Sequence, residues 1–231
     1  MIDIHTHILP CIDDGASSLQ EAIELLLAEK QQGITGVVFT PHFVLQDKSL
    51  NNFIEERNAA FNLLKKEIEK TGLCQDMEFY LGAEVRYDPN LIKEDLFALC
   101  IEGTSYLLLE PLNVYPYNFE KTLDAILSMG ITPIIAHVER FNYLIKDEKL
   151  LSRLLNNGVV FQSNAHAVLS RKFGSKNAKK LIKRGIVQVI ASDTHNLECR
   201  PPMLKEAFKK LSKHESYLKR NAQRIVSDKL I

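Results

Sequence analysis

The 231-residue sequence lacks several features that would mark other classes of protein. It has no tryptophan, and no two of its four cysteines form a CxxC pair: Cys11, Cys74, Cys100 and Cys199. Scattered cysteines argue against a zinc ribbon or a disulfide scaffold and fit the reducing cytoplasm. No segment approaches 18 unbroken apolar residues, and the first residues carry no basic stretch. We therefore expect neither a membrane span nor a secretory signal.

Net charge is also absent, because 29 Lys and Arg residues balance 29 Asp and Glu residues. This balance argues against a strongly nucleic-acid-binding protein. The charges are unevenly distributed, since residues 1–170 carry 13 basic and 24 acidic side chains, whereas residues 171–231 carry 16 and 5. The basic cluster at 179–184 fits the solvated face of a surface helix, and few aromatic residues accompany it for base stacking.

What the sequence does contain is a regular alternation of short apolar runs and longer amphipathic stretches, in an ordinary globular composition of 45% hydrophobic residues. The expected strands are Met1–His5, Thr35–Thr40, Met77–Glu84, Ser105–Glu110, Ile131–His137, Val159–Asn164 and Ile186–Asp193. Near-continuous apolar strands joined by helices predict an α/β fold with a parallel sheet buried on both faces. Seven units in one unbroken series favour a single domain over residues 1–231, as a closed or nearly closed barrel; an open doubly wound sheet is the alternative.

The expected helices have recognisable ends. They are Ser17–Gln32, Asn51–Lys70, Asn90–Cys100, Asn118–Met129, Asp147–Asn156, Ser175–Arg184, a helix opened by Pro201-Pro202, and Glu215–Ser227. For the first helix, Ser17 or Ser18 is the expected N-cap, Glu21 lies at capping-box spacing and Gly33 ends the helix.

Residue types that ligate metals gather where the predicted strands end. Six of the seven histidines are found there, together with three acidic residues. These residues are His5, His7, His42, Glu84, Glu110, His137, His166, Asp193 and His195. A single histidine after a strand is more often a solvated loop residue. In a parallel barrel, however, the carboxyl ends of the strands meet on one face, so these residues would share one cleft.

The chemistry of this residue set favours divalent metal ions. His, Asp and Glu suit Mn, Zn or Fe when no paired cysteines are available. Alternate residues on a strand point to the same side, so His5 and His7 could bind one ion together. The candidate carboxylates are too many for one catalytic zinc and imply two or three bridged ions: Asp14, Glu84, Glu110 and Asp193.

Several segments resemble a known family. They are Met1–Ile8, Asp13–Gly15, Gly82–Val85, Ile131–Arg140, and Val189–Asn196 followed by Arg200-Pro201-Pro202. The sequence resembles, nearly end to end, the PHP (polymerase and histidinol phosphatase) superfamily of metal-dependent phosphoesterases. It is most similar to the bacterial protein-tyrosine phosphatase branch, the CpsB/YwqE-like regulators of capsule and exopolysaccharide synthesis. The resemblance implies a distorted (β/α)₇ TIM-like barrel, the PHP fold, with a trinuclear metal site.

The resemblance also implies which residues hold the ions. One ion would take His5, His7, Glu84 and Asp193; a second Asp14, His42 and His195; a third Glu110 and His137, with Glu84 as a bridge. Two to three ions are therefore expected, with Mn²⁺ first and Fe or Zn as alternatives. Asp13 could replace Asp14, and no role is assigned to His166.

Arg140 and Arg200 follow the fifth and seventh strands, three and five residues beyond a candidate ligand histidine. A guanidinium group matches phosphate oxygens bidentately, which favours phosphate binding over an ordinary surface role. The implied mechanism is attack on phosphorus by a metal-activated hydroxide. None of the four cysteines has an arginine six positions later, so a cysteine-based tyrosine phosphatase is excluded. No residue stands out as a general acid.

Together with the scattered cysteines, the resemblance thus implies a cytoplasmic, metal-dependent phosphoesterase that hydrolyses phosphotyrosine on proteins. The expected partner is an autophosphorylated tyrosine kinase of capsule or exopolysaccharide synthesis. One alternative is a small-molecule phosphoesterase of the histidinol-phosphatase type. A second is a non-catalytic metal-binding barrel, against which the intact donor set argues.

Overall fold

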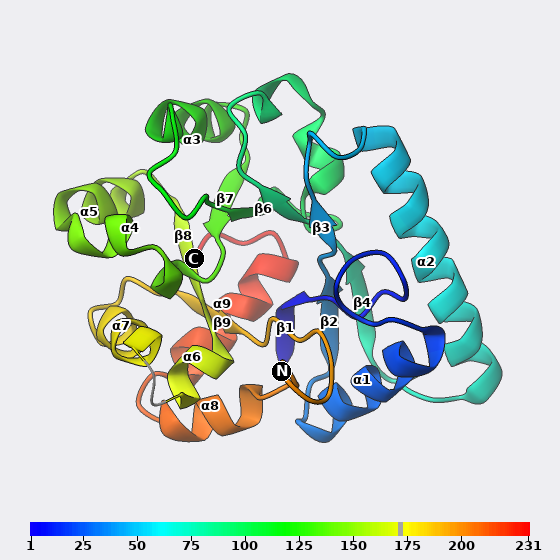
Figure 1. The fold of residues 1–231 in the computed structure, drawn as a ribbon. Coiled ribbons are helices and arrows are strands. Elements are labelled where there is room, and N and C mark those ends of the chain that lie inside the picture. Colours follow the sequence, from blue (N-terminus) through cyan, green and yellow to red (C-terminus); the bar gives the residue numbers. More distant parts are fainter. Residues whose placement is uncertain (171–172) are drawn as a thin grey trace.

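The strands form a curled parallel sheet inside a ring of helices (Figure 1). The computed structural model describes residues 1–170 and 173–231, with side chains described from 1–170 and 176–231. One sheet has the order β1 (Ile2–Thr6), β2 (Gly36–Phe39), β4 (Glu78–Leu81). The other has the order β3 (His42–Phe43), β5 (Glu84–Arg86), β6 (Tyr106–Glu110), β7 (Thr132–Ile135), β8 (Val160–Asn164), β9 (Val189–Ala191). Thr6 pairs in parallel with Thr194, just after β9, so the edges at β1 and β9 meet.

Two predicted strands are interrupted where the chain crosses from one sheet to the other. The strand expected at 35–40 ends at Phe39, and the chain continues past Pro41 into β3. The strand expected at 77–84 is divided at Gly82 into β4, which pairs with β2, and β5, which pairs with β3 and β6. With each interrupted strand counted once, the described chain has the seven parallel units of the expected distorted barrel, and the predicted fold class is confirmed.

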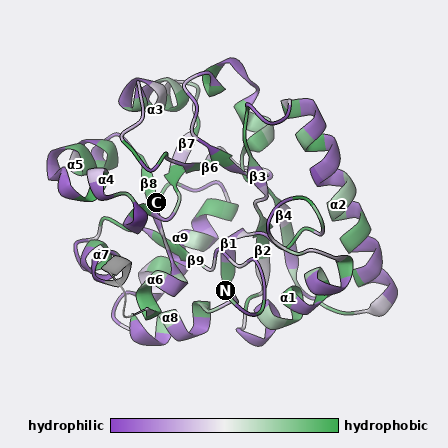
Figure 2. Cartoon of the chain, in the orientation of Figure 1, coloured by the Kyte–Doolittle hydropathy of each residue, from purple (hydrophilic) through white to green (hydrophobic). Residues whose placement is uncertain are grey.

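Most predicted helices are present. The α-helices are α1 (Leu19–Gln31), α2 (Leu50–Thr71), α3 (Phe119–Ser128), α4 (Asn142–Lys146), α5 (Glu148–Asn156), α6 (Ala165–Leu169), α7 (Phe173–Lys183), α8 (Leu204–Lys210) and α9 (Glu215–Val226). Hydrophilic and hydrophobic residues alternate along α1 and α2, as amphipathic outer helices require (Figure 2). The prediction of a helix at 90–100 is wrong, because this segment forms two short 3₁₀ turns, Leu91–Lys93 and Leu96–Leu99. None of the described helices combines the length and the apolar character that crossing a membrane requires.

Local capping follows the prediction in part. Ser18 is the N-cap of α1, and its hydroxyl accepts a hydrogen bond from the Glu21 backbone N–H at 3.1 Å. The Glu21 carboxylate does not return to Ser18 but accepts from the backbone N–H and the hydroxyl of Ser17, at 2.9 and 2.6 Å. Gly33, with φ +82°, follows the helix in the left-handed conformation that glycine adopts at low cost.

The hydrophobic core lies in two layers that leave one end of the barrel for polar residues. An inner cluster of strand side chains, including Ile4, Leu108 and Ile134, packs against Ile225 of α9. A larger cluster fills the space between the strands and the outer helices. The helix α9 lies within the ring formed by the other helices (Figure 1) and packs against β1 and β9. The Tyr106 hydroxyl, at the start of β6, donates to the Lys229 carbonyl just beyond α9. The C-terminal segment therefore covers the amino ends of the strands.

An irregularity in β1 changes the direction of its side chains. Asp3 pairs with Val37 and Thr6 pairs with Phe39, so β1 uses one more residue than β2 over this stretch. Ile4 and His5 both lie within the irregularity. Ile4 belongs to the inner core, and the ring of the next residue, His5, also reaches the groups at the open end of the barrel. A β-bulge of this kind re-aims side chains, and such bulges occur frequently beside active sites.

Beneath this bulge, two carboxyl groups are fully buried against each other. Asp3 and Glu29 both have 0% exposure. The Ser192 backbone N–H donates to Asp3 Oδ1 at 3.1 Å, and the Ser192 hydroxyl donates to Glu29 Oε1 at 3.3 Å. Burial, reinforced by the negative charge of Asp3, raises the pKa of Glu29 well above its ordinary value. Glu29 therefore links α1 to the seam between β1 and β9 as a protonated acid.

Replacing Glu29 with Gln should remove a pH-dependent loss of folding stability while preserving the shape of the side chain. In the wild-type protein, Glu29 ionises in the unfolded chain above roughly pH 4.3 but stays protonated in the folded chain, so stability falls as the pH rises toward the raised pKa. We expect the free energy of unfolding of Glu29→Gln, relative to wild type, to be higher at pH 8 than at pH 5. Urea denaturation at both pH values measures this. The exposed Glu24→Gln on the same helix is the control, and an equal difference at both pH values for Glu29→Gln would contradict the assignment.

Candidate metal centre

The carboxylate of Glu84 lies at the open end of the barrel and contacts four histidines. Glu84 Oε2 is 3.2 Å from His5 Nε2, 3.3 Å from His7 Nε2 and 3.0 Å from His42 Nδ1. Its other oxygen, Oε1, is 2.8 Å from His137 Nε2. Pairing of β3 with β5 places His42 directly opposite Glu84. Residues predicted from four separate strand ends therefore meet at one buried carboxylate.

The two neighbouring aspartates of the loop after β1 face different groups. Asp14 Oδ1 lies 3.2 Å from His42 Nε2 and 3.3 Å from His195 Nε2. Asp13 Oδ2 instead contacts His7 Nδ1 at 2.7 Å and accepts from the His42 backbone N–H at 3.0 Å. Asp13 thereby turns the Nε2 of His7 toward Glu84, the way a carboxylate behind a ligand histidine usually does. Of the two, Asp14 is the one whose carboxylate oxygen lies close to several candidate ligand atoms.

Asp193 approaches the same centre from the turn after β9, next to β1. Its Oδ1 lies 3.5 Å from His5 Nε2 and 3.5 Å from His7 Nε2. Its Oδ2 accepts from Asn164 Nδ2 at 2.5 Å and from Arg140 Nη2 at 3.0 Å. One oxygen of Asp193 is thus directed at the histidines while the other is held by amide and guanidinium donors.

Gln162 and Asn164 of β8 hold other residues of the centre in place, a role that was not predicted for them. Gln162 Nε2 donates to Asn164 Oδ1 at 2.9 Å, and Gln162 Oε1 accepts from the His137 backbone N–H at 2.7 Å. The side-chain amide of Asn164 in turn donates to Asp193 Oδ2. The available signal was two polar residues at alternate positions on a strand that is otherwise expected to be buried and apolar.

The donor atoms fall into three groups whose members lie within 4.8 Å of one another. These are His5, His7, Glu84 and Asp193; His7, Asp14, His42 and His195; and His42, Glu84 and Glu110. The first group equals the first predicted one, the second adds His7, and the third has His42 where His137 was expected. His137 lies close by, with its Nε2 3.5 Å from Glu110 Oε1. All nine candidate ligands are therefore brought together, and their role as ligands stays a prediction.

This donor set fits divalent transition-metal ions. Imidazole nitrogens and carboxylate oxygens provide every donor in the three groups, as expected for Mn, Fe or Zn sites. His5 Nε2 and His7 Nε2 lie only 3.1 Å apart and point toward the same two carboxylates. A cation shared by these atoms would satisfy all of them together.

In the centre, opposite charges on histidines and carboxylates offset the cost of burying each other. Burial opposes the charged form of His7, but the Asp13 hydrogen bond and the nearby Glu84 raise its pKa to about 10. Burial likewise opposes ionisation of Asp193, yet His5 and His7 hold its pKa at about 2. Burial together with the neighbouring His7 lowers the pKa of His195 to about 4. The carboxylate of Asp193 is thus held in the ionised form that binds cations.

Two of the candidate ligands have an uncommon backbone conformation. His137 has φ +31° and Asp193 has φ +55°, in the left-handed region that non-glycine residues rarely occupy. Such strain costs on the order of 1–3 kcal/mol and is concentrated at functional sites. In both cases the residue follows a strand by two positions, and the turn directs its side chain into the centre.

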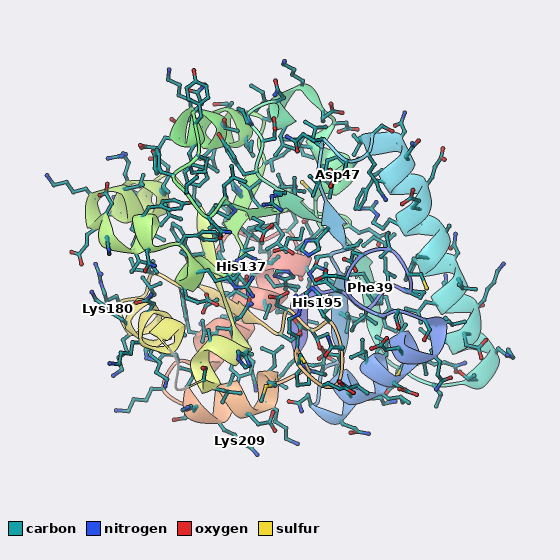
Figure 3. The ribbon with its side chains drawn as sticks, viewed as in Figure 1. Phe39, Asp47, His137, Lys180, His195 and Lys209 are labelled. Carbon is teal, nitrogen blue, oxygen red and sulfur yellow. The ribbon has the colours of Figure 1, made fainter. Side chains whose placement is uncertain are left out.

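The two predicted arginines lie between the donor groups and a cavity of about 490 Å³. Arg200 Nη2 is 2.6 Å from Asp14 Oδ2, and Arg140 bonds to Asp193. Arg140, Arg200 and His166 all line the cavity, but His166 lies on α6 outside the three donor groups. Figure 3 shows His137 and His195 in the middle of the ribbon, whereas Lys180 and Lys209 lie at its periphery.

The curled parallel barrel and its converging imidazole and carboxylate donors are typical of metal-dependent hydrolases of the TIM-barrel type. The model of the family "Capsular polysaccharide synthesis, CpsB/CapC" matches residues 1–229, and the chain belongs to this family. The resemblance drawn from the sequence is thereby confirmed.

Individual relatives agree with this assignment. The chain is 39% identical to CapC of Staphylococcus aureus over 95% of this chain and 89% of CapC. It is 32% identical to the tyrosine-protein phosphatase CpsB of Streptococcus pneumoniae, over 100% of both chains. It also superposes with a TM-score of 0.91 and 26% identity on a structure from work on YwqE of Bacillus subtilis and CpsB of S. pneumoniae, described as unique metal-dependent tyrosine phosphatases; the match covers 100% of this chain and 96% of the other.

Gly15 offers a test of how closely the loop that carries Asp13 and Asp14 must approach β1. A Cβ atom at this position would lie 1.9 Å from the His7 carbonyl oxygen, far inside any real contact distance. We expect Gly15→Ala to displace Asp13 and Asp14 and to lower Mn²⁺ affinity by at least the roughly 10–100-fold that loss of an outer-shell partner costs. Gly82→Ala is the control, because its Cβ would meet nothing closer than 3.4 Å. Titration calorimetry measures both variants, and equal affinities would contradict the placement of this loop.

Proposed function

We propose that this chain hydrolyses phosphotyrosine in proteins, as a metal-dependent enzyme that uses no cysteine nucleophile. The observation that carries the proposal is the convergence of nine imidazole and carboxylate residues, Glu84 among them, with two guanidinium groups beside them. The tyrosine phosphatase activity named for the S. pneumoniae and B. subtilis relatives supports this choice of substrate.

Each group in the centre has a definable task. The three donor groups would hold two or three divalent ions, and their oxygen and nitrogen donors suit Mn²⁺, with Fe or Zn as alternatives. When bound, such ions polarise a phosphoryl group and lower the pKa of water. Arg140 and Arg200 would bind the non-bridging phosphate oxygens and stabilise the charge that develops on them. Asn164 and Asp13 keep Asp193 and His7 oriented throughout.

We further propose that the substrate is an autophosphorylated tyrosine kinase of capsule or exopolysaccharide synthesis, and that the reaction occurs in the cytoplasm. The capsular polysaccharide synthesis family supports the first point. The four free cysteines support the second, because Cys11 and Cys199 are exposed and unpaired thiols persist in a reducing compartment.

Removing the metal should abolish hydrolysis reversibly. We expect purified protein to release phosphate from a phosphotyrosine peptide, to lose this activity after chelation, and to regain it on addition of Mn²⁺. Phosphoserine peptide and histidinol phosphate serve as comparison substrates, measured by phosphate release under identical conditions. Equal turnover of all three esters would contradict the proposed specificity and favour a general small-molecule phosphoesterase.

Substitution at the centre should separate the proposed ligands from other histidines. His137→Ala removes a contact to Glu84, so kcat should fall by more than the roughly 10–100-fold typical of outer-shell losses. His214→Ala is the matched control, since His214 precedes α9 at the covered end of the barrel. Metal content by mass spectrometry should fall for His137→Ala alone. Unchanged kcat and metal content in His137→Ala would refute the assigned site.

A further inference from the structure

The loop between β6 and α3 exposes large apolar side chains beside the metal centre. It spans residues 111–118, directly after Glu110, and contains no charged residue. Within four positions, Val114 is 70% exposed, Tyr115 49% and Tyr117 80%. Exposed apolar residues that cluster in this way mark interaction surfaces more often than isolated ones do.

Tyrosine hydroxyl groups from neighbouring segments hold the backbone of this loop. The Tyr87 hydroxyl donates to the Tyr117 carbonyl oxygen at 2.6 Å, and the Tyr143 hydroxyl donates to the Leu112 carbonyl oxygen at 2.9 Å. The Tyr115 hydroxyl donates to Glu120 Oε1 at 3.1 Å. A loop held in this way presents its side chains without a large entropy cost on binding.

A row of ring contacts connects the loop to the centre. Ring centroids are 5.6 Å apart for His137 and Phe141, 5.9 Å for Phe141 and Tyr143, and 5.6 Å for Tyr143 and Tyr115. Asn142, which lines the cavity beside Arg140, lies between Phe141 and Tyr143 in the chain. A row of packed rings therefore links the exposed loop at Tyr115 to the centre at His137.

We propose that Val114, Tyr115 and Tyr117, here called the aromatic loop, bind the polypeptide that flanks the phosphotyrosine of the substrate. This inference rests on the proposed function and adds a sequence preference to it. Because the loop carries no charge, it should favour aromatic or aliphatic side chains in the flanking segment. Three ring-to-ring contacts of 5.6 to 5.9 Å separate Tyr115 from His137. An extended peptide advances about 3.3–3.6 Å per residue, so positions roughly three to five residues from the phosphotyrosine would reach the loop.

The test compares two phosphotyrosine peptides and a small aryl ester in the metal-loaded enzyme. One peptide carries Tyr and Leu at the flanking positions three to five, the other carries Ser and Gly there, and the ester is p-nitrophenyl phosphate. The variant is the double substitution Val114→Ser with Tyr117→Ser, whose side chains are largely exposed, so the fold should be unaffected. The control is Tyr217→Ser, because Tyr217 is 43% exposed on α9 at the covered end of the barrel.

We expect the double variant to raise KM for the Tyr/Leu peptide by about tenfold, as the loss of two apolar contacts would. Its KM for the Ser/Gly peptide and its kcat/KM for p-nitrophenyl phosphate should stay at the wild-type values. For Tyr217→Ser, the KM for each peptide and the kcat/KM for p-nitrophenyl phosphate should all stay at the wild-type values. A wild-type enzyme with no preference between the peptides, or a double variant that keeps the preference, would overturn the inference and leave the proposed function intact. A wild-type enzyme that cleaves the aryl ester but neither peptide would overturn both.

Discussion

The contact of Glu84 with four histidines is the interaction on which the rest of the structure depends. A fully desolvated carboxylate costs several kcal/mol unless compensating groups surround it. Here the compensation comes from the ends of β1, β3 and β7, so the barrel must close correctly for any one of these contacts to form. The centre is therefore a product of the whole topology, since no single strand or loop contains enough of it to bind an ion alone.

The barrel divides its two ends between stability and chemistry. At the amino ends of the strands, α9 and the inner apolar cluster exclude water. At the carboxyl ends, polar side chains, the strained backbones of His137 and Asp193 and the aromatic loop lie together. This is the usual arrangement of parallel barrels, where loops at the carboxyl ends change without loss of the core beneath them. The buried pair Asp3 and Glu29 lies at the boundary, linking the two regions across the seam between β1 and β9.

Much of this arrangement was predictable from the sequence, because apolar runs, helix stops and strand-end histidines are all local patterns. The seven parallel units and the gathering of the nine candidate ligands follow from those patterns. The bulge in β1 was not predictable, and simple alternation would have placed His5 on the same side as Asp3, toward α1. The register of His42 against Glu84 is also a tertiary property, since a two-residue strand carries no recognisable pattern. No role could be assigned to Gln162 or to Asn164 at the strand end, because their partners are backbone and side-chain groups of distant segments.

The seam between β1 and β9 also determines when the centre can exist during synthesis. The His7 backbone N–H donates to the Thr194 carbonyl oxygen, and that of Asp193 donates to the His5 carbonyl oxygen, so the first and last strands complete each other. Almost the whole chain separates these partners, and a ribosome adding about 5–20 residues per second needs on the order of 10–40 s to pass from one to the other. Throughout that interval the early histidines are present without Asp193. The donor group of His5, His7, Glu84 and Asp193 therefore cannot form until β9 and the turn after it have been made, so this group cannot act as a template for the early stages of folding.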